Sequence, residues 1–136
     1  MKEKRIKVLK VEPGKVPEVV WLKNTLSELQ KAVSIGSDYV GLIEIINLSD
    51  KVCILCNEEA KLIGLEPNRR FYGDILCGTF YVTGQTKDGD LTSLPKEAFI
   101  VFEYLFAVPE VIPQEEVSDT MFTRFTIWEG DGKDDL

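Results

Sequence analysis

A turn pair, Pro13-Gly14, separates two short segments of strand-like composition near the start of the chain. Residues Arg5–Glu12 (RIKVLKVE) are rich in β-branched and aliphatic side chains, and Glu18–Lys23 (EVVWLK) has the same character. The short connection between them predicts an antiparallel β-hairpin. The fold is therefore expected to contain a sheet with antiparallel pairing.

The rest of the chain alternates between helix and strand signals. Thr25 and Glu28 have the spacing of a capping box, which predicts a helix that ends at Gly36. The further predicted elements are strands at Asp38–Ile46, Lys51–Cys56 and Asp74–Thr83, with a bulge or close backbone approach at Gly78, and helices at Asn57–Gly64 and Leu94–Val108. These elements predict an α+β fold: a mainly antiparallel sheet with helices packed on one face.

The size and charge of the chain predict one domain with an acidic extension. A chain of 136 residues with 44% hydrophobic content can bury one core. We expect an α+β domain at residues 1–107 and an extension at residues 108–136, in which Thr120–Trp128 adds an edge strand before a disordered acidic tail. The extension carries −6 of the net charge of −7.

The composition also excludes several function classes. Residues 1–107 are nearly neutral and show no basic stripe, so direct nucleic-acid binding is not expected. No segment reaches the roughly 18 apolar residues that a membrane span needs, and the N-terminus has no signal-peptide pattern. We therefore expect a cytoplasmic protein with no membrane contact.

The three cysteines, Cys53, Cys56 and Cys77, lie in apolar surroundings and are expected to be buried thiols. Cys53 and Cys56 satisfy the C-x-x-C spacing, but residues three apart on a strand face opposite sides of the sheet. The chain has no histidine, so a zinc site would need carboxylates from elsewhere. No metal and no cofactor is predicted.

The segment Asn57–Gly64 (NEEAKLIG) contains adjacent acids that resemble a catalytic pair. Helix capping explains them better, since Asn57 favours the N-cap, Glu58 and Glu59 suit the first turn, and Gly64 suits the C-cap. Adjacent helical residues point about 100° apart and would not converge on one proton or metal. No catalytic residue is predicted, and a carboxylate- or metal-dependent enzyme is kept as an alternative.

The two arginines that follow are not explained by capping. Arg69 and Arg70 have guanidinium groups that suit carboxylate or phosphate recognition. One interpretation is that they pair with Glu44, Asp74 or a first-turn glutamate. The other is an anion-binding site on a loop between strands. Its predicted ligand-binding residues are Arg69, Arg70, Asn68 and Lys61.

The predicted helix at Leu94–Val108 is apolar nearly all round. Phe99, Phe102 and Phe106 share one face, but apolar residues leave little polar surface opposite. Such a helix is either a core helix covered by the C-terminal segment or an interface, for example in a homodimer.

Several motifs together resemble a family of unknown activity. They are Val11-Glu12-Pro13-Gly14, Asn24-Thr25-Leu26, Asn57-Glu58-Glu59, Gly64-Leu65, Asn68-Arg69-Arg70, and Asp74-Ile75 with Gly78-Thr79. On these motifs, residues 5–107 resemble domain of unknown function 3846. The chain departs from that pattern at Ile35–Val40, where one of two expected glycines is missing. The resemblance implies an accessory protein of phages, plasmids and gut-type bacteria, and it implies no catalytic residue.

The leading functional hypothesis is a non-enzymatic binding module of a phage or mobile element. Its ligand would be a host protein or a small anionic, nucleotide-like molecule, and its role would be to counter a host defence system. The alternative is a protein-interaction module or nucleic-acid mimic that acts through the acidic tail or the apolar helix.

Overall fold

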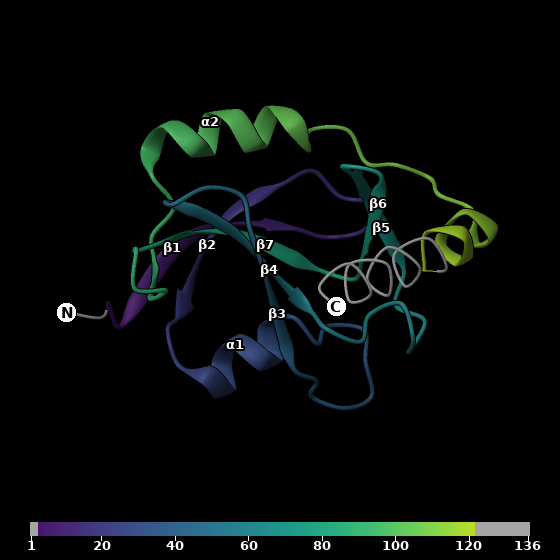
Figure 1. Ribbon diagram of the computed structural model, residues 1–136, viewed down its shortest axis with the longest axis horizontal. Coiled ribbons are helices and arrows are strands. Elements are labelled where there is room, and N and C mark those ends of the chain that lie inside the picture. Colours follow the sequence, from purple (N-terminus) through teal and green to yellow (C-terminus); the bar gives the residue numbers. More distant parts are fainter. Residues whose placement is uncertain (1–2, 122–136) are drawn as a thin grey trace, which may run out of the picture.

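The computed structural model describes residues 3–121 of the chain. Its elements are β1 (Arg5–Val11), β2 (Glu18–Lys23), α1 (Leu26–Ala32), β3 (Ile43–Asn47), β4 (Val52–Asn57), β5 (Pro67–Phe71), β6 (Asp74–Cys77), β7 (Phe80–Gln85), β8 (Leu91–Thr92) and α2 (Lys96–Leu105). A further helical segment occupies residues 114–121. The main sheet has the order β2-β1-β7-β4-β3 with β8 beside β7, while β5 and β6 form a second sheet (Figure 1). The α+β class and the antiparallel pairing are confirmed.

The predicted first hairpin is present. β1 and β2 pair from Arg5 opposite Lys23 to Lys10 opposite Glu18. The turn has Pro13 and then Gly14, whose φ is 74°, and it closes with a hydrogen bond from Lys15 N to Glu12 O of 3.2 Å. Proline fixes the first central residue of this turn, and glycine tolerates the positive φ of the second.

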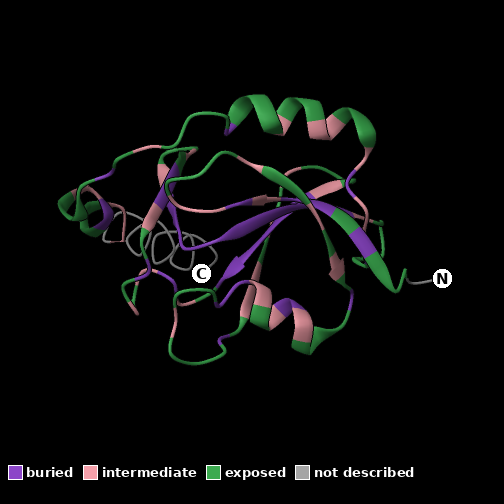
Figure 2. Cartoon of the chain, turned by 180° about the vertical axis from the view of Figure 1, so that it is seen from behind, coloured by how far each residue is buried: buried purple, intermediate pink, exposed green. Residues whose placement is uncertain are grey.

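The helices α1 and α2 lie on opposite faces of the main sheet (Figure 1). Cys53 of β4 packs in a cluster with Leu29 of α1, while its neighbour Ile54 packs in a cluster with Phe102 of α2. The expectation of helices on one face is therefore wrong. The reason is that β4 and β7 are buried on both sides, as Figure 2 shows in purple, so both faces of the sheet must be covered.

The burial of the three cysteines follows from this arrangement. Cys53 and Cys56 belong to clusters on opposite faces, and Cys77 lies in a third cluster, so all three are buried and unbridged, as predicted. Burial raises the pKa of the Cys53 and Cys77 thiols. These residues fill the core as small apolar side chains.

The first helix begins at the predicted cap. Thr25 Oγ1 accepts a hydrogen bond from the N–H of Glu28 at 3.4 Å. The helix ends at Ala32, four residues before Gly36, and turns fill the interval. Gly36 has a φ of 89° and ends these turns, which is the role expected of a glycine at the end of a helical segment.

The predicted strand Asp74–Thr83 is two strands in two different sheets. Gly78, with a φ of 73°, separates β6 from β7 and donates its N–H to Glu66 O at 2.7 Å. A Cβ at Gly78 would lie 2.8 Å from Leu65 Cδ1, so the predicted close approach is confirmed. The chain leaves one sheet and enters the other at this residue.

The strand β5 was not predicted, because its residues were expected to form a loop. It pairs with β6 through a two-residue turn, Tyr72-Gly73, in which both residues have positive φ, 49° and 74°. Positive φ at both central positions is the geometry that matches the twist of paired strands. The arginines therefore lie on a strand and not on a loop.

The predicted helix at Asn57–Gly64 is absent, because Asn57 is the last residue of β4 and residues 58–64 form successive turns. Asn57 Oδ1 still accepts from Glu59 N at 2.8 Å, and Gly64 has a φ of 75°. Leu65 N donates to Ala60 O at 2.9 Å, which is the closing bond expected after a left-handed glycine. The predicted caps are present, but the segment is too short for a regular helix to propagate between them.

Residues 107–121, the described part of the chain after α2, do not cover the outward face of that helix. Residues 107–121 run towards β5 and β6 (Figure 1), where Ile112 and Val117 pack with Ile75 and Cys77. Thr120, the first residue of the predicted edge strand, is helical. The rest of that strand beyond residue 121 and the predicted disordered tail lie outside the described residues. No helix among residues 3–121 is long and apolar enough to cross a membrane.

Candidate functional site

A bulge in β5 determines where the predicted anion-binding residues lie. Pro67 is opposite Cys77 and Arg69 is opposite Leu76, so Asn68 is an extra residue in the ladder. Because of this bulge, the adjacent side chains of Asn68 and Arg69 are both buried, while Arg70 is exposed. The two arginines therefore lie on different sides of the hairpin and do not form one pocket.

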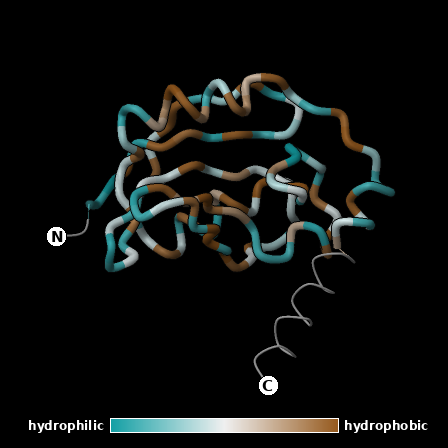
Figure 3. Tube along the Cα trace, turned by 45° about the horizontal axis from the view of Figure 1, so that its top comes forward, coloured by the Kyte–Doolittle hydropathy of each residue, from teal (hydrophilic) through white to brown (hydrophobic). Residues whose placement is uncertain are grey.

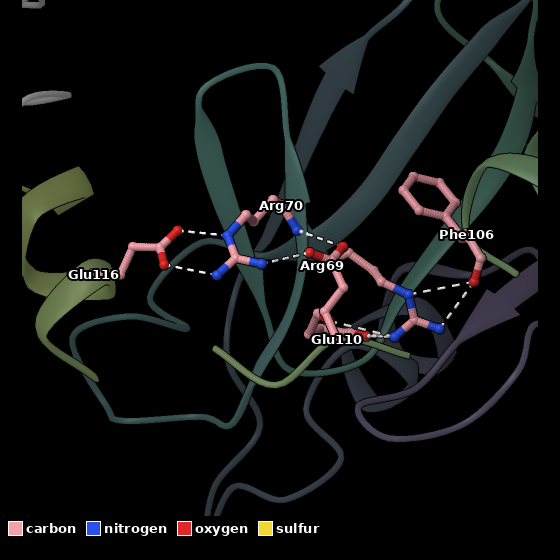
Figure 4. Close-up of polar contacts among 6 residues, drawn as sticks. Arg69, Arg70, Phe106, Glu110 and Glu116 are labelled. Atoms are coloured by element: carbon pink, nitrogen blue, oxygen red, sulfur yellow. Dashed lines mark hydrogen bonds and ion pairs between the residues drawn. The ribbon is translucent and has the colours of Figure 1, made fainter. Parts of the chain in front are cut away.

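Arg69 is fully buried and bonds mainly to the backbone of distant segments. Its Nε and Nη2 donate to Phe106 O at 3.3 and 3.0 Å (Figure 4). Its Nη2 also donates to Lys15 O at 2.6 Å. Its Nη1 donates to Asn68 Oδ1 at 2.7 Å. Burial lowers the pKa of Arg69, and the carboxylate of Glu110 opposes this effect. Arg69 connects the first turn, β5 and the end of α2.

Asn68 completes this buried network. Its Nδ2 donates to Val11 O at 2.9 Å and to Gly78 O at 2.8 Å, while its Oδ1 accepts from Arg69. Every polar side-chain group of Asn68 is thus bonded within the protein. A buried amide in this position satisfies one backbone carbonyl at the end of β1 and one between β6 and β7.

Arg70 points outwards and binds the C-terminal extension. Its Nε and Nη2 donate to the two carboxylate oxygens of Glu116 at 2.6 and 2.7 Å (Figure 4). Its Nη1 and its backbone N–H donate to Glu110 at 2.9 and 3.1 Å. The hydrogen bonds to Glu116 and Glu110 raise the pKa of Arg70, and the bond from Arg70 lowers the pKa of Glu116.

Lys61 lies away from the arginines. Its Nζ pairs with Asp74 Oδ1 and donates to Thr120 Oγ1 at 3.1 Å. It lines a cavity of about 300 Å³ together with Glu58, Cys56, Cys77 and Met121. Within residues 3–121, no group of three histidine, cysteine or carboxylate side chains is placed to hold a metal ion.

The structure thus brings together only two of the four predicted ligand-binding residues, Asn68 and Arg69, in a closed network. The interpretation that the arginines pair within the chain has the better geometric support, although the partners differ from those considered. Glu110 and Glu116 were missed because they follow Arg70 by 40 and 46 residues, a separation that no local pattern connects. The only sequence signal for these partners was the acidity of the extension.

A larger groove lies beside α2. It has a volume of about 1040 Å³ and is lined by Val101, Tyr104 and Leu105 of α2, Phe71 and Tyr72 of the β5–β6 hairpin, and Ile46 of β3. Tyr72 is 90% exposed and Tyr104 is 86% exposed. We call this the α2 groove. The lining residues from α2 and the hairpin are mostly apolar. Those from β3 and the turn after it include polar side chains.

The outward side of α2 continues the apolar surface of this groove. Ile100, Val101, Tyr104 and Leu105 are exposed, and so are Val108 and Val111 beyond the helix. Figure 3 shows hydrophobic residues in brown along much of α2. We call these six residues the α2 surface. The sequence identified the apolar helix but not Tyr72, which comes from a hairpin that was not predicted.

Comparison with known proteins is consistent with the sequence motifs. A family model described as Domain of unknown function (DUF3846) matches residues 6–106. No curated protein and no solved structure matches the chain. The matched region runs from Ile6 in β1 to Phe106, whose carbonyl binds Arg69. It therefore includes the strands of both sheets and α2. The chain belongs to the family Domain of unknown function (DUF3846).

Proposed function

We propose that this chain is a non-enzymatic module that binds another protein through the α2 surface and the α2 groove. The observation that carries the proposal is the exposure of α2: Ile100 is 72% exposed, and no residue of the helix is buried. An exposed apolar patch of this kind marks an interaction site more often than a free surface.

A protein partner suits this surface better than a membrane. Helices that lie on membranes carry lysine and arginine on their polar face. α2 has only Lys96 as a basic residue, and it also contains Glu97 and Glu103. A chain with a net charge of −7 would be repelled by an anionic lipid surface.

A different protein is also favoured over a second copy of this chain. Glu97 and Glu103 flank the apolar residues of α2, so two copies would bring like charges to the same interface. The same charges complement a partner whose apolar contact surface has a basic rim. The volume of the α2 groove, about 1040 Å³, suits a polypeptide segment with several side chains.

A small anion at Arg69 and Arg70 has less support. Arg69 is buried and occupied by carbonyls, and Arg70 is occupied by Glu110 and Glu116. An anion at either residue would have to replace those partners. We further propose a host protein as the class of partner and the countering of a host defence as the role of binding, on the expectation that this family serves phages and mobile elements.

The test is site-specific photo-crosslinking in a bacterial host. A benzophenone amino acid at Tyr104 should link to one host protein, whereas the same group at Leu62, which is also exposed but lies elsewhere, should not. Ile100→Asp in the Tyr104-labelled protein should abolish the crosslink. The control Val16→Asp changes an exposed apolar residue of the first turn and should leave it intact.

Two results would contradict the proposal. One is a crosslinking pattern that is the same from Tyr104 and Leu62, or that Ile100→Asp does not change. The other is a crosslink to this chain itself, together with a dimer mass in light scattering that Ile100→Asp converts to a monomer. That second result would identify the α2 surface as a homodimer interface.

A further inference from the structure

One face of the β1–β2 hairpin carries three cations around an exposed tryptophan. In the antiparallel register, Arg5 is opposite Lys23 and Lys7 is opposite Trp21. Directly opposite residues share a face of the sheet, and every second residue of a strand returns to it. Arg5, Lys7, Trp21 and Lys23 therefore share one face, and all four are exposed. We call them the β1–β2 basic surface.

The pairing of Arg5 with Lys23 is unfavourable by itself. Like charges directly opposite each other on a sheet destabilise the pairing. Among residues 3–121, no carboxylate forms an ion pair with Arg5, Lys7 or Lys23, although Lys10 and Lys15 in the same hairpin both pair with Glu12. Single unpaired lysines are common on surfaces. Two lysines and an arginine on one face of one hairpin, with no ion-pair partner among residues 3–121, leave a local positive charge.

The nearest acidic residue along β1 is already engaged. Glu3 precedes Arg5 by two residues, and its carboxylate oxygens accept hydrogen bonds from Ser93 N and Ser93 Oγ, both at 3.3 Å. It therefore holds Ser93, between β8 and α2, and forms no ion pair with Arg5, Lys7 or Lys23. The cations are available to a ligand that brings its own negative charge.

Aromatic rings lie beside these cations. The guanidinium carbon of Arg5 is 5.7 Å from the centroid of the Trp21 ring, and Lys7 Nζ is 6.0 Å from that of Phe99. Trp21 is 56% exposed although it is one of the largest apolar side chains. Exposed indole rings are the side chains on which planar bases stack in proteins that bind nucleotides.

A cavity of about 480 Å³ lies next to these residues, at β2 and α1. Arg5, Trp21 and Lys23 line one side of it, and its other lining residues include Glu28 and Lys31 of α1 and Tyr81 of β7. Tyr81 and α1 pack on the face of the sheet opposite to α2, and Lys7 does not line the cavity. The cavity therefore borders the β1–β2 basic surface at the edge of β2 and does not enclose it.

We propose that the β1–β2 basic surface binds a mononucleotide, with the base against Trp21 and the phosphates against Arg5, Lys23 and Lys7. An aromatic ring joined to a compact anion matches the two chemistries that this surface combines. Arg5 and Lys7 are two residues apart on a strand, a span of about 7 Å, which suits a di- or triphosphate but not the long track of a nucleic-acid strand. This site goes beyond the protein-binding role proposed for α2 and does not depend on it.

The test uses ADP as the probe and Trp21 as the reporter. Trp128→Phe removes the only other tryptophan of the chain, so that fluorescence reports Trp21 alone. ADP should quench this fluorescence in a saturable way at up to millimolar concentration. Adenosine and pyrophosphate, which each supply one half of the ligand, should bind at least about tenfold more weakly than ADP, because each loses the stacking or the charge-assisted contacts.

Variants separate binding from folding. Arg5→Ala and Lys23→Ala should each weaken ADP binding about tenfold, while Lys51→Ala and Lys87→Ala, at exposed lysines in turns, should not change it. Lys23→Glu should abolish binding and yet raise the melting temperature, because it replaces a like-charge pair with an opposite pair. The proposal is overturned if ADP does not bind, if pyrophosphate binds as tightly as ADP, or if the Lys51 and Lys87 variants weaken binding equally.

Discussion

The guanidinium of Arg70 and the carboxylate of Glu116, 46 residues further along the chain, form a two-bond fork with distances of 2.6 and 2.7 Å. This contact joins the hairpin of β5 and β6 to the extension that follows the family region. Because both groups are near the surface, this ion pair adds little to the free energy of unfolding. Its main effect is to orient the extension. Arg70 positions the extension over Ile75 and Cys77, where Ile112 and Val117 pack.

We expect Glu116→Gln to loosen residues 110–121 in a pH-dependent manner. The pKa of Glu116 is lowered in the folded chain, so its stabilisation is fully present above the ordinary glutamate pKa of about 4.3 and is lost as the pH falls through the lowered value. Hydrogen exchange in this segment should therefore be faster in the variant at neutral pH and equal to wild type in strong acid. Glu115→Gln, at an exposed neighbour, is the control and should have no effect. A difference that persists in strong acid would contradict the pairing.

We expect Arg69→Met to lower the free energy of unfolding by roughly 3 to 5 kcal/mol, because the shorter apolar side chain leaves several buried acceptors without donors. The affected acceptors are Phe106 O, Lys15 O and Asn68 Oδ1. Urea denaturation measures the change. Arg70→Met removes an exposed arginine from the same strand and should cost less. Equal losses in the two variants would show that the buried network is not the main effect.

We expect Gly78→Ala to destabilise the fold by about 1 to 3 kcal/mol, since it combines a positive φ with a steric conflict. The new Cβ would lie 2.8 Å from Leu65 Cδ1. Gly89 is the matched control, because it has a φ of 89° but no neighbour within 4 Å of an added Cβ. The difference between the stability losses of Gly78→Ala and Gly89→Ala measures the effect of the close approach. Adding Leu65→Ala to Gly78→Ala should show a favourable coupling in thermal denaturation.

We expect all three thiols to resist modification in the native protein at mildly alkaline pH. Cys53, Cys56 and Cys77 are buried, and burial raises the pKa of Cys53 and Cys77, so little reactive thiolate is present. A thiol-reactive chromogenic disulfide should label the chain only as fast as it unfolds. In guanidinium chloride, all three thiols should react at once. Fast labelling of one thiol without denaturant would indicate an open route to that residue.

The sequence predicts those elements whose signals are local. The first hairpin, the Thr25 cap and the close approach at Gly78 each depend on residues within a few positions of one another, and all three are present. The left-handed glycine at Gly64 also occurs, although the helix before it does not.

The sequence does not predict features that depend on tertiary pairing. β5 has little strand propensity in Pro67–Phe71 and exists because β6 pairs with it and the Tyr72-Gly73 turn closes it. The bulge that places Asn68 and Arg69 on the same side of β5 has no signature in three adjacent polar residues. For the same reason, the sequence misplaces the candidate binding surfaces. Both arginines bind partners within the chain, and the opposition of Arg5 and Lys23 becomes visible only through the register.

The position of β1 in the sheet has a consequence for synthesis of the chain. β1 lies between β2 and β7, and its second neighbour contributes residues such as Phe80 and Val82, which the ribosome adds about 70 residues after Leu9. Until β7 is available, the nascent chain exposes one edge of its earliest hairpin and the apolar face that α2 later covers. Folding of this domain is therefore delayed until most of it has been translated, and fragments that stop before residue 80 should need chaperones to stay unaggregated.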